Sequence, residues 1–299
     1  PEIDDHTEIR LAGTKPFDEF EEAKALNIAT RPVITGAFTL LKLLRYTGSK
    51  TAEEYAGDVI TAYSELLIKL NHIGAEWVQF DEPYLVYDLT ESDIALFEKL
   101  YSGILSTKNK VKVLLQTYFG DIRDCYKNVS ELDFDGIGLD FVEGKKTFEL
   151  ISENGFADGK ILFAGAVNGK NIWKNNYERT LDLTARLKAK GIETVLSTSC
   201  SLLHVPYTLK NETKLPQKYL AHFAFAEEKL LELAELKLLS ETDYTNENLY
   251  KANIALHQNR PDCNDPAVKK RVASIKESDF TRLPASDERE KIQKKEFSL

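Results

Sequence analysis

Short apolar runs alternate with longer amphipathic segments through the first two thirds of the chain. Six of these runs are bounded by Gly, Asn, Asp or Pro, which is typical of short buried strands. They cover residues 31–36, 76–80, 112–118, 136–141, 160–167 and 193–198. The segments between them carry apolar residues at helical spacing. This alternation predicts βαβ units with parallel strand pairing.

Helices are predicted before the first strand and in every interval between strands. They cover residues 17–26, 37–45, 52–73, 92–101, 121–129, 147–151 and 177–190. One longer helix is predicted over residues 215–239, where it would cover the barrel. We expect its apolar side to consist of Tyr219, Leu220, Phe223, Leu230, Leu233 and Leu236, and its acidic face of Glu227, Glu228, Glu232 and Glu235.

The number and spacing of the strands favour an α/β fold of the TIM-type (βα)8 barrel class. A dinucleotide-binding sheet is disfavoured because no GxGxxG follows any strand. A complete barrel has eight strands, so six are visible and the first two are expected to be missing. The chain has no Met and begins with Pro1. We interpret this as a sign that sequence precedes Pro1 and holds those two strands.

The composition changes after Ser240, where Ser, Thr, Asn and Asp become frequent. Residues 259–262 read Asn-Arg-Pro-Asp, which predicts a turn. We therefore expect a barrel domain over residues 1–239 and an interdomain linker or appendage over residues 240–299.

Composition and charge exclude several classes of protein. With 42% hydrophobic and 29% charged residues, the chain resembles an ordinary soluble globular protein. Its net charge of −9 lacks the basic footprint of a nucleic-acid-binding protein. No apolar run is long enough to span a membrane. The three cysteines, Cys125, Cys200 and Cys263, form no CxxC pair, so we expect a reducing cytoplasm rather than a disulfide framework.

Candidate functional residues follow from the barrel fold, because chemistry in such barrels lies at the carboxyl ends of the strands. The residues at or just beyond those ends that could take part in chemistry are Asp81, Glu82, Tyr118, Asp140, Asn168, Ser199, Cys200 and His204. We treat them as candidates for lining a substrate cleft.

Two adjacent carboxylates, Asp81 and Glu82, are the most suggestive pair. They could bind a ligand amine or act as acid and base. Successive side chains point in different directions, however, so one of them could instead cap a helix or pair with Arg. Asp140 ends another buried strand and needs a partner, which could be a structural Arg or Lys.

Cys200 and His204 form a second suggestive pair. A Cys and a His four residues apart could ligate zinc or act as nucleophile and base. One of each is too few to complete a zinc site. The alternative is that Cys200 is a small buried hydrophobic residue and His204 a hydrogen-bonded loop residue.

Five ordered segments carry a resemblance to a known family. They read EWVQFDEP from Glu76, LQTYF from Leu115, GLDFV from Gly138, AGAVNGKNIW from Ala164 and SCSLLH from Ser199. Together with NDPAV from Asn264 and the closing QKKEFSL, they resemble the N-terminal domain of cobalamin-independent methionine synthases.

The resemblance implies an activity and a division of labour. Such enzymes have two similar barrels placed face to face, and they transfer a methyl group from 5-methyltetrahydrofolate polyglutamate to homocysteine without cobalamin. Zinc and homocysteine belong to the C-terminal barrel, whose ligands include a His-x-Cys pair. Residues 116–118 stand at the corresponding place here and carry no such pair. We therefore expect a zinc-free part of the enzyme that supports its C-terminal barrel, forms one wall of the folate cleft and is inactive alone.

Two other classes of function stay open. A self-standing barrel enzyme could use Asp81, Glu82 and Asp140 as paired carboxylates in glycoside hydrolysis. A uroporphyrinogen decarboxylase would need Arg residues at the strand ends, which are absent. The other open class is a noncatalytic interaction module.

Overall fold

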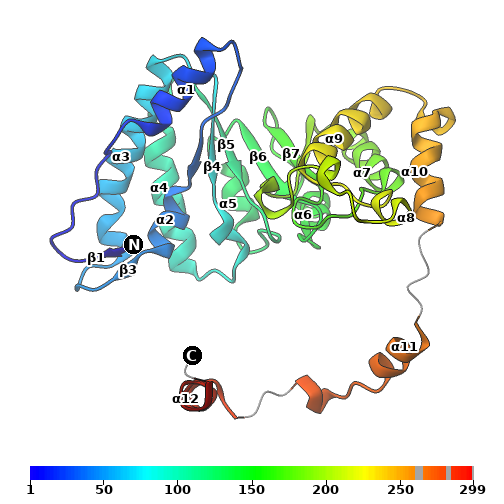
Figure 1. Cartoon of the computed structure of the whole chain (residues 1–299). Helices are drawn as coiled ribbons and strands as arrows, with labels where there is room; N and C mark the ends of the chain where they lie inside the picture. The colour runs from blue at the N-terminus through cyan, green and yellow to red at the C-terminus, as the bar shows by residue number, and fades with distance from the viewer. Residues whose placement is uncertain (260–264, 281–283, 298–299) are drawn as a thin grey trace. The chain divides into compact units, whose positions relative to one another are not determined.

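A computed structural model describes residues 1–259, 265–280 and 284–297 (Figure 1). The chain divides into two compact units, Pro1–Gln258 and Asn259–Leu299. All the strands found in the described residues belong to the first unit. Its helices are interleaved with those strands, as the sequence predicts.

A six-stranded parallel sheet forms the centre of the first unit. Its order is β2-β4-β5-β6-β7-β8, with only sequential neighbours paired. The strands are β2 (Val33–Thr35), β4 (Trp77–Asp81), β5 (Lys112–Gln116), β6 (Gly136–Asp140), β7 (Ile161–Val167) and β8 (Thr194–Thr198). All six predicted strands are therefore confirmed. Within the described residues β2 and β8 each pair on one side, so the sheet has two open edges.

Helices follow the strands and bury one face of the sheet. They are α1 (Lys15–Ala25), α2 (Ala37–Leu43), α3 (Ala52–His72), α4 (Glu91–Leu105), α5 (Tyr126–Glu131), α6 (Thr147–Asn154) and α7 (Tyr177–Ala189). The longest, α3, begins with a capping box in which Thr51 and Glu54 satisfy each other's free backbone amides. It runs beside α4 (Figure 1). A small separate sheet pairs β1 (Glu2–Ile3) with β3 (Arg45–Tyr46).

The two faces of the sheet differ in character. Along β4, Val78 and Phe80 are fully buried in the main core, while Trp77, Gln79 and Asp81 alternate with them on the other face. That second face carries both polar and apolar side chains. At its open edges Val33 is 54% exposed and Val195 is 41% exposed.

The predicted long helix over residues 215–239 is wrong as a single element. The structure has a short α8 (Gln217–Leu220), an irregular segment and then α9 (Ala226–Ser240). The irregular segment pairs with the loop between β7 and α7, because Ala224 N–H donates to Ile172 O and Lys174 N–H donates to His222 O. Trp173 and Phe223 form an antiparallel bridge between the two segments. These backbone hydrogen bonds replace those that a continuous helix would have made.

The break also changes which side of the helix is buried. The buried residues of α9 are Lys229, Glu232, Leu236 and Leu239. Leu230, which we expected on the apolar side, is 57% exposed, and Glu232, expected on the acidic face, is 3% exposed. The prediction is therefore wrong for these two residues and for Tyr219, which is 41% exposed. The face of α9 that meets the sheet carries an ammonium and a carboxylate.

The end of the first unit lies beyond the predicted boundary at residue 239. Helix α10 (Asn248–Gln258) packs on α7, where Asn253 accepts a hydrogen bond from the Tyr177 amide. The division between the compact units therefore falls at Gln258/Asn259. The second unit contains α11 (Pro266–Ala273) and α12 (Ser286–Phe297). Cys263 and Asn264 lie outside the described residues.

Candidate functional site

The predicted site residues lie at the carboxyl ends of β4 to β8 and in the loops that follow. The β4–β5 register places Asp81 opposite Gln116, two residues before Tyr118. The β6–β7 register places Asp140 opposite Gly165. The candidates differ in their surroundings. Glu82 is a buried carboxylate, Asp81 pairs with Tyr118 just beyond the next strand, Asp140 holds two loops, and others lie at or near an exposed rim.

Glu82 is fully buried and faces the first turn of α2 rather than the open face of the sheet. Its Oε1 accepts hydrogen bonds from Phe38 N (2.9 Å) and Tyr101 OH (2.5 Å). Its Oε2 accepts from Thr39 N (2.7 Å) and Thr39 Oγ1 (2.5 Å). Burial raises its pKa to about 7, and the four hydrogen bonds oppose that rise. Glu82 therefore caps a helix and has no free oxygen for a substrate.

The backbone of Gly36 lies very close to the Glu82 carboxyl group. A Cβ on Gly36 would lie 2.2 Å from the Glu82 carboxyl group. Only glycine allows the chain to pass so close to this side chain. The turn from β2 through Gly36 into α2 thus packs directly against the Glu82 carboxylate.

Asp81 lies on the opposite face and belongs to an interstrand pair. It accepts hydrogen bonds from Gln79 Nε2 (2.7 Å) and from Tyr118 OH (3.3 Å). Partial burial raises its pKa, while these two donors and the charge of Arg31 lower it. Arg31 stacks over the ring of Phe163 at 5.1 Å, and its buried Nε has no partner. Of the two adjacent carboxylates, Asp81 is the one placed near an Arg.

Asp140 anchors two loops and is nearly fully buried. Its carboxylate accepts hydrogen bonds from the amides of Phe119 (3.0 Å), Val142 (2.7 Å) and Glu143 (2.9 Å). Phe119 has a φ of +76°, a conformation that costs a bulky residue energy and needs support. The hydrogen bond to Asp140 supplies that support. Asp140 therefore sets the position of the Phe119 ring rather than facing a ligand with a free oxygen.

The end of β7 is tied to the end of β8 through a glycine. Ser199 Oγ accepts a hydrogen bond from Gly169 N at 3.2 Å, and a Cβ on Gly169 would lie 2.9 Å from Cys200 Sγ. Cys200 is 5% exposed, and burial raises the pKa of its thiol. Asn168 Oδ1 closes a turn by accepting from the amides of Lys170 and Asn171.

An exposed rim around Phe119 brings together residues from the four connections that follow β5, β6, β7 and β8. The His204 ring meets the Phe119 ring edge to face at 5.5 Å. Lys170 Nζ lies 4.8 Å from the centre of the same ring and 2.9 Å from Glu143. The Tyr118 ring is also in contact with Phe119. Sequence reasoning found Tyr118 and His204 but missed Phe119, Lys170 and Glu143, although the first two stand inside quoted motifs.

The candidate residues do not fit a zinc ion. Among residues 1–259, 265–280 and 284–297, no three or more His, Cys, Asp or Glu side chains are placed to hold a metal. Cys200 is a buried thiol whose Sγ lies 3.7 Å from Ser201 O, while His204 packs on Phe119. Cys200 is thus buried, as in the alternative, and the His204 ring contacts Phe119; the roles of the two residues stay a prediction.

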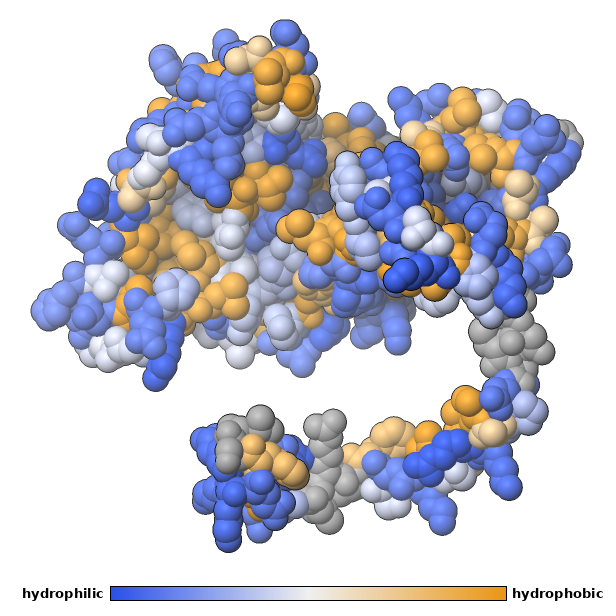
Figure 2. Space-filling view, viewed as in Figure 1, coloured by the Kyte–Doolittle hydropathy of each residue, from blue (hydrophilic) through white to orange (hydrophobic). Residues whose placement is uncertain are grey.

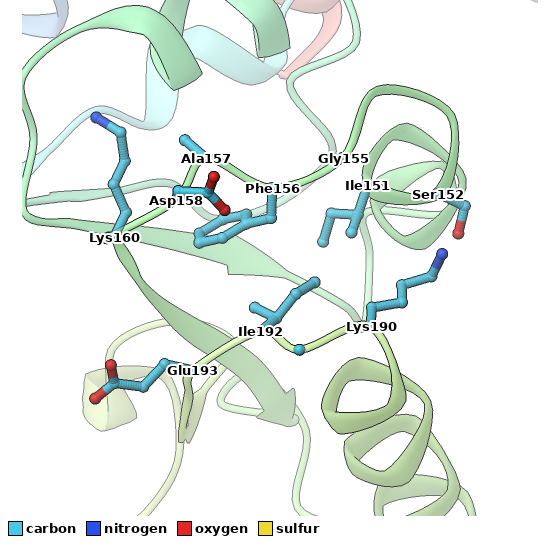
Figure 3. A pocket seen from close by; sticks show the side chains of 12 residues that line it. Ile151, Ser152, Gly155, Phe156, Ala157, Asp158, Lys160, Lys190, Ile192 and Glu193 are labelled. Atoms are coloured by element: carbon cyan, nitrogen blue, oxygen red, sulfur yellow. The ribbon is translucent and has the colours of Figure 1, made fainter.

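A cavity of 420 Å³ lies at the other end of the sheet, between the α6–β7 and α7–β8 connections. Figure 3 shows Phe156 and Ile192 in the middle of its lining, between Lys160 and Lys190. Lys160 Nζ donates to the carbonyls of Leu132 and Phe134, so its ammonium is already hydrogen-bonded within the protein. The amino-terminal end of a barrel serves stability rather than chemistry, and we assign no site there.

The surface and the helices add two findings. Figure 2 shows apolar residues in separate patches among hydrophilic ones. In the described part of the chain, no helix is both long and apolar enough to cross a membrane.

Comparison with known proteins gives a consistent result. Residues 1–191 match the family described as "Cobalamin-independent synthase, N-terminal domain". A 5-methyltetrahydropteroyltriglutamate–homocysteine methyltransferase of Campylobacter jejuni subsp. doylei is 48% identical over the whole chain, which covers 40% of that protein. The enzyme of the same name from Lactococcus lactis subsp. lactis is 46% identical, and the chain covers 39% of it. The chain thus spans about two fifths of the length of these relatives.

Solved structures support the fold alone. A putative vitamin-B12 independent methionine synthase from Listeria monocytogenes aligns with a TM-score of 0.61 at 15% identity, over 80% of this chain and 72% of that one. A B12-independent methionine synthase from Shewanella sp. W3-18-1 gives a TM-score of 0.51 at 19% identity, over 78% and 68%.

Proposed function

Because the chain belongs to the cobalamin-independent methionine synthase family, as its N-terminal domain, we propose that it serves in methyl transfer from 5-methyltetrahydropteroyltriglutamate to homocysteine. Its part is to support the catalytic region and to form one wall of the folate cleft. The observation that carries this proposal is the 48% identity over all 299 residues to an enzyme named for that reaction.

Zinc and homocysteine belong, on this proposal, to the part of the enzyme that lies outside this domain. The relatives are about 2.5 times longer than this chain, which leaves room for a second domain as its partner. Two buried free thiols, Cys125 and Cys200, fit a location in the cytoplasm.

The rim around Phe119 is the cleft wall in this proposal. It combines an aromatic ring, a cation and a histidine at the carboxyl end of the sheet. An aromatic ring packs well on such a surface, and carboxylates are attracted to the lysine. Folate polyglutamate carries both groups.

Two measurements test the two parts of the proposal. The first is methionine formation from methyltetrahydrofolate triglutamate and homocysteine by this chain alone. We expect none above the uncatalysed background, and turnover by the chain alone would refute the noncatalytic role.

The second compares two lysines in the full-length enzyme. Lys170→Met changes the rim, while Lys190→Met makes the same change to an exposed lysine 5.8 Å from the Phe148 ring at the other end of the sheet. We expect Lys170→Met to raise the KM for the folate several-fold at unchanged kcat, and Lys190→Met to change neither. Equal kinetics for the two variants would exclude the rim from the cleft.

The glycoside hydrolase alternative loses support from the same geometry. Glu82 has four hydrogen bonds inside the protein, and Asp140 accepts three from backbone amides. Of the three carboxylates, Asp81 alone is left for such a reaction, which requires two.

A further inference from the structure

The loop between β7 and α7 is attached to α9 by two buried charged side chains that the proposed function does not use. Lys229 is completely buried, and its Nζ donates to Trp173 O at 3.1 Å. Glu232, one turn later, is 3% exposed and accepts from Asn175 N at 2.9 Å through Oε1. Both side chains thus hold the same short stretch of loop.

The Glu232 carboxylate is only half satisfied. Its Oε2 is buried and has no hydrogen-bond partner. An ionised carboxylate in such a place loses hydration without regaining it from donors, so its neutral form is favoured. Burial also disfavours the charged form of the neighbouring Lys229 and lowers the pKa of its ammonium, while the charge of Glu232 raises that pKa.

Asn175 connects this pair to the rest of the loop. Its side chain donates to Ala166 O at the end of β7 and accepts from Thr180 Oγ1. Its carbonyl accepts from Asn253 Nδ2 and lies 3.0 Å from His257 Nε2 on α10. Glu232 is therefore hydrogen-bonded to a residue, Asn175, that also contacts β7, α7 and α10.

We propose that Glu232 and Lys229 are positioning residues for the β7–α7 loop. The ionisation state of Glu232 sets how firmly the loop is held against α9, and with it the placement of Lys170 and Trp173 at the carboxyl end of the sheet. This inference goes beyond the proposed function and stands whether or not that end of the sheet binds folate.

The direction of the effect follows from burial. Burial raises the Glu232 pKa to about 7, while the Asn175 amide and the charges of Lys229 and Lys174 lower it and Glu235 raises it. Below about pH 7 the neutral side chain stays buried and the loop is held. Above it Glu232 releases its proton to solvent, Oε2 has no donor, and a looser, hydrated arrangement becomes favourable.

Other titratable groups face the same region and must be separated from Glu232. On α9 they are Lys229 and Glu235, and Glu235 accepts a hydrogen bond from Tyr177 OH on α7. Lys174 lies in the loop, His257 on α10, and Cys200 at the end of β8 adds to the field at Lys229. Of these, His257 is the group whose ordinary pKa lies nearest to the same pH range.

The experiment uses Trp173, whose ring packs on Phe223 at 5.2 Å beside the attachment. The chain has two tryptophans, so Trp77→Phe leaves Trp173 as the single reporter. Its emission and its quenching by acrylamide are followed from about pH 5.5 to about pH 8.5, a range centred on the raised pKa of Glu232. We expect one transition near pH 7, with greater quenching on the alkaline side.

Variants on this background decide the origin of the transition. Glu232→Gln should abolish it, and Lys229→Met should move it to higher pH because the ionised carboxylate loses its counter-charge. Glu241→Gln at the exposed end of α9 and His257→Gln should leave it in place. The proposal is overturned if the transition persists in Glu232→Gln, is absent from the parent, or disappears in His257→Gln. Because no folate is present, these outcomes do not depend on the proposed function.

Discussion

Two buried glutamates hold two regions of the same sheet in opposite ways. At the end of β4, Glu82 receives four hydrogen bonds, so both of its oxygens are satisfied. Beside β7 and β8, Glu232 receives one, and its Oε2 has no partner. Burial raises the pKa of both to about 7. Similar pKa values thus arise in two different settings: Glu82 has donors on both oxygens, whereas Glu232 has one donor and charged neighbours, Lys229, Lys174 and Glu235.

The two glutamates should therefore differ in how their surroundings respond to loss of the carboxyl proton. Ionisation of Glu82 is matched by donors already in place, whereas ionisation of Glu232 is not. The β2–β6 part of the sheet is therefore expected to behave as a fixed scaffold. The β7–β8 part is expected to respond to its surroundings.

Removing the Glu82 carboxylate should have the largest effect. Glu82→Ala leaves the donors of Phe38, Thr39 and Tyr101 buried and unpaired, so we expect the free energy of unfolding to fall by about 4 kcal/mol. Urea unfolding followed by circular dichroism measures it. Glu153→Ala, an exposed glutamate on α6, is the control and should change stability by less than about 0.5 kcal/mol. Equal losses in the two variants would contradict the capping role.

Asp140 extends the comparison to a third buried carboxylate. Asp140→Asn replaces one accepting oxygen by a donor, so at least one of the Phe119, Val142 and Glu143 amides loses its partner. We expect a loss of about 2 kcal/mol and a change in the amide signals of Phe119 by NMR. Unchanged Phe119 signals would show that its positive φ does not depend on Asp140.

Tyr101→Phe tests a single donor of the satisfied glutamate. It removes the 2.5 Å hydrogen bond to Glu82, together with the 3.3 Å one that Tyr101 OH accepts from Ala37 N, and leaves the ring contacts with Phe97 and Phe134. We expect a loss of about 1.5 kcal/mol in urea unfolding. Tyr87→Phe, at an exposed tyrosine, should be neutral, and a Tyr101→Phe protein as stable as the parent would refute the importance of this donor.

Glu232→Gln should have the smallest effect on stability and the opposite sign. Above about pH 7 the parent carries an ionised carboxylate whose Oε2 has no donor in the folded structure, whereas the variant carries a neutral amide. We expect the variant to be more stable by up to about 1 kcal/mol at pH 8, and the gain to vanish at pH 6. A loss of stability at pH 8 would show that Oε2 is satisfied after all.

The sign of the pH dependence is the same for both glutamates. Since their pKa values are raised from 4.5 to about 7, the folded chain holds protons that the unfolded chain releases in this interval. The free energy of unfolding therefore falls as pH rises from about 4.5 through about 7. Glu82→Gln and Glu232→Gln should each make that fall smaller.

Sequence reasoning served well where one physical signal dominated. The six strands follow from apolar runs whose burial decides their place, and the position of the candidate residues follows from the rule about strand ends. Their role in lining a substrate cleft stays a prediction. It also foresaw that either Asp81 or Glu82 could be a helix cap. It could not say which, because that depends on Gly36 and on the distant hydroxyl of Tyr101.

It failed where tertiary contacts override periodicity. The irregular segment before α9 exists because residues 222–224 pair with the loop around Trp173, and no local pattern shows such pairing. Glu232 was predicted on the acidic outer face, and Lys229 was not considered, because charged side chains are rarely buried. The rim residues Phe119 and Lys170 were missed because an aromatic ring and a lysine in a loop are common on any surface.

Hydrogen exchange at two amides tests the central contrast most directly. Thr39 N–H donates to Glu82 and Asn175 N–H donates to Glu232, so one sample reports on both regions. Protection is measured by NMR at about pH 6 and about pH 8, with the intrinsic pH dependence of exchange divided out. The account predicts that protection at Asn175 falls at the higher pH by a clearly larger factor than protection at Thr39. Equal behaviour of the two amides, or loss of protection at Thr39 alone, would contradict it.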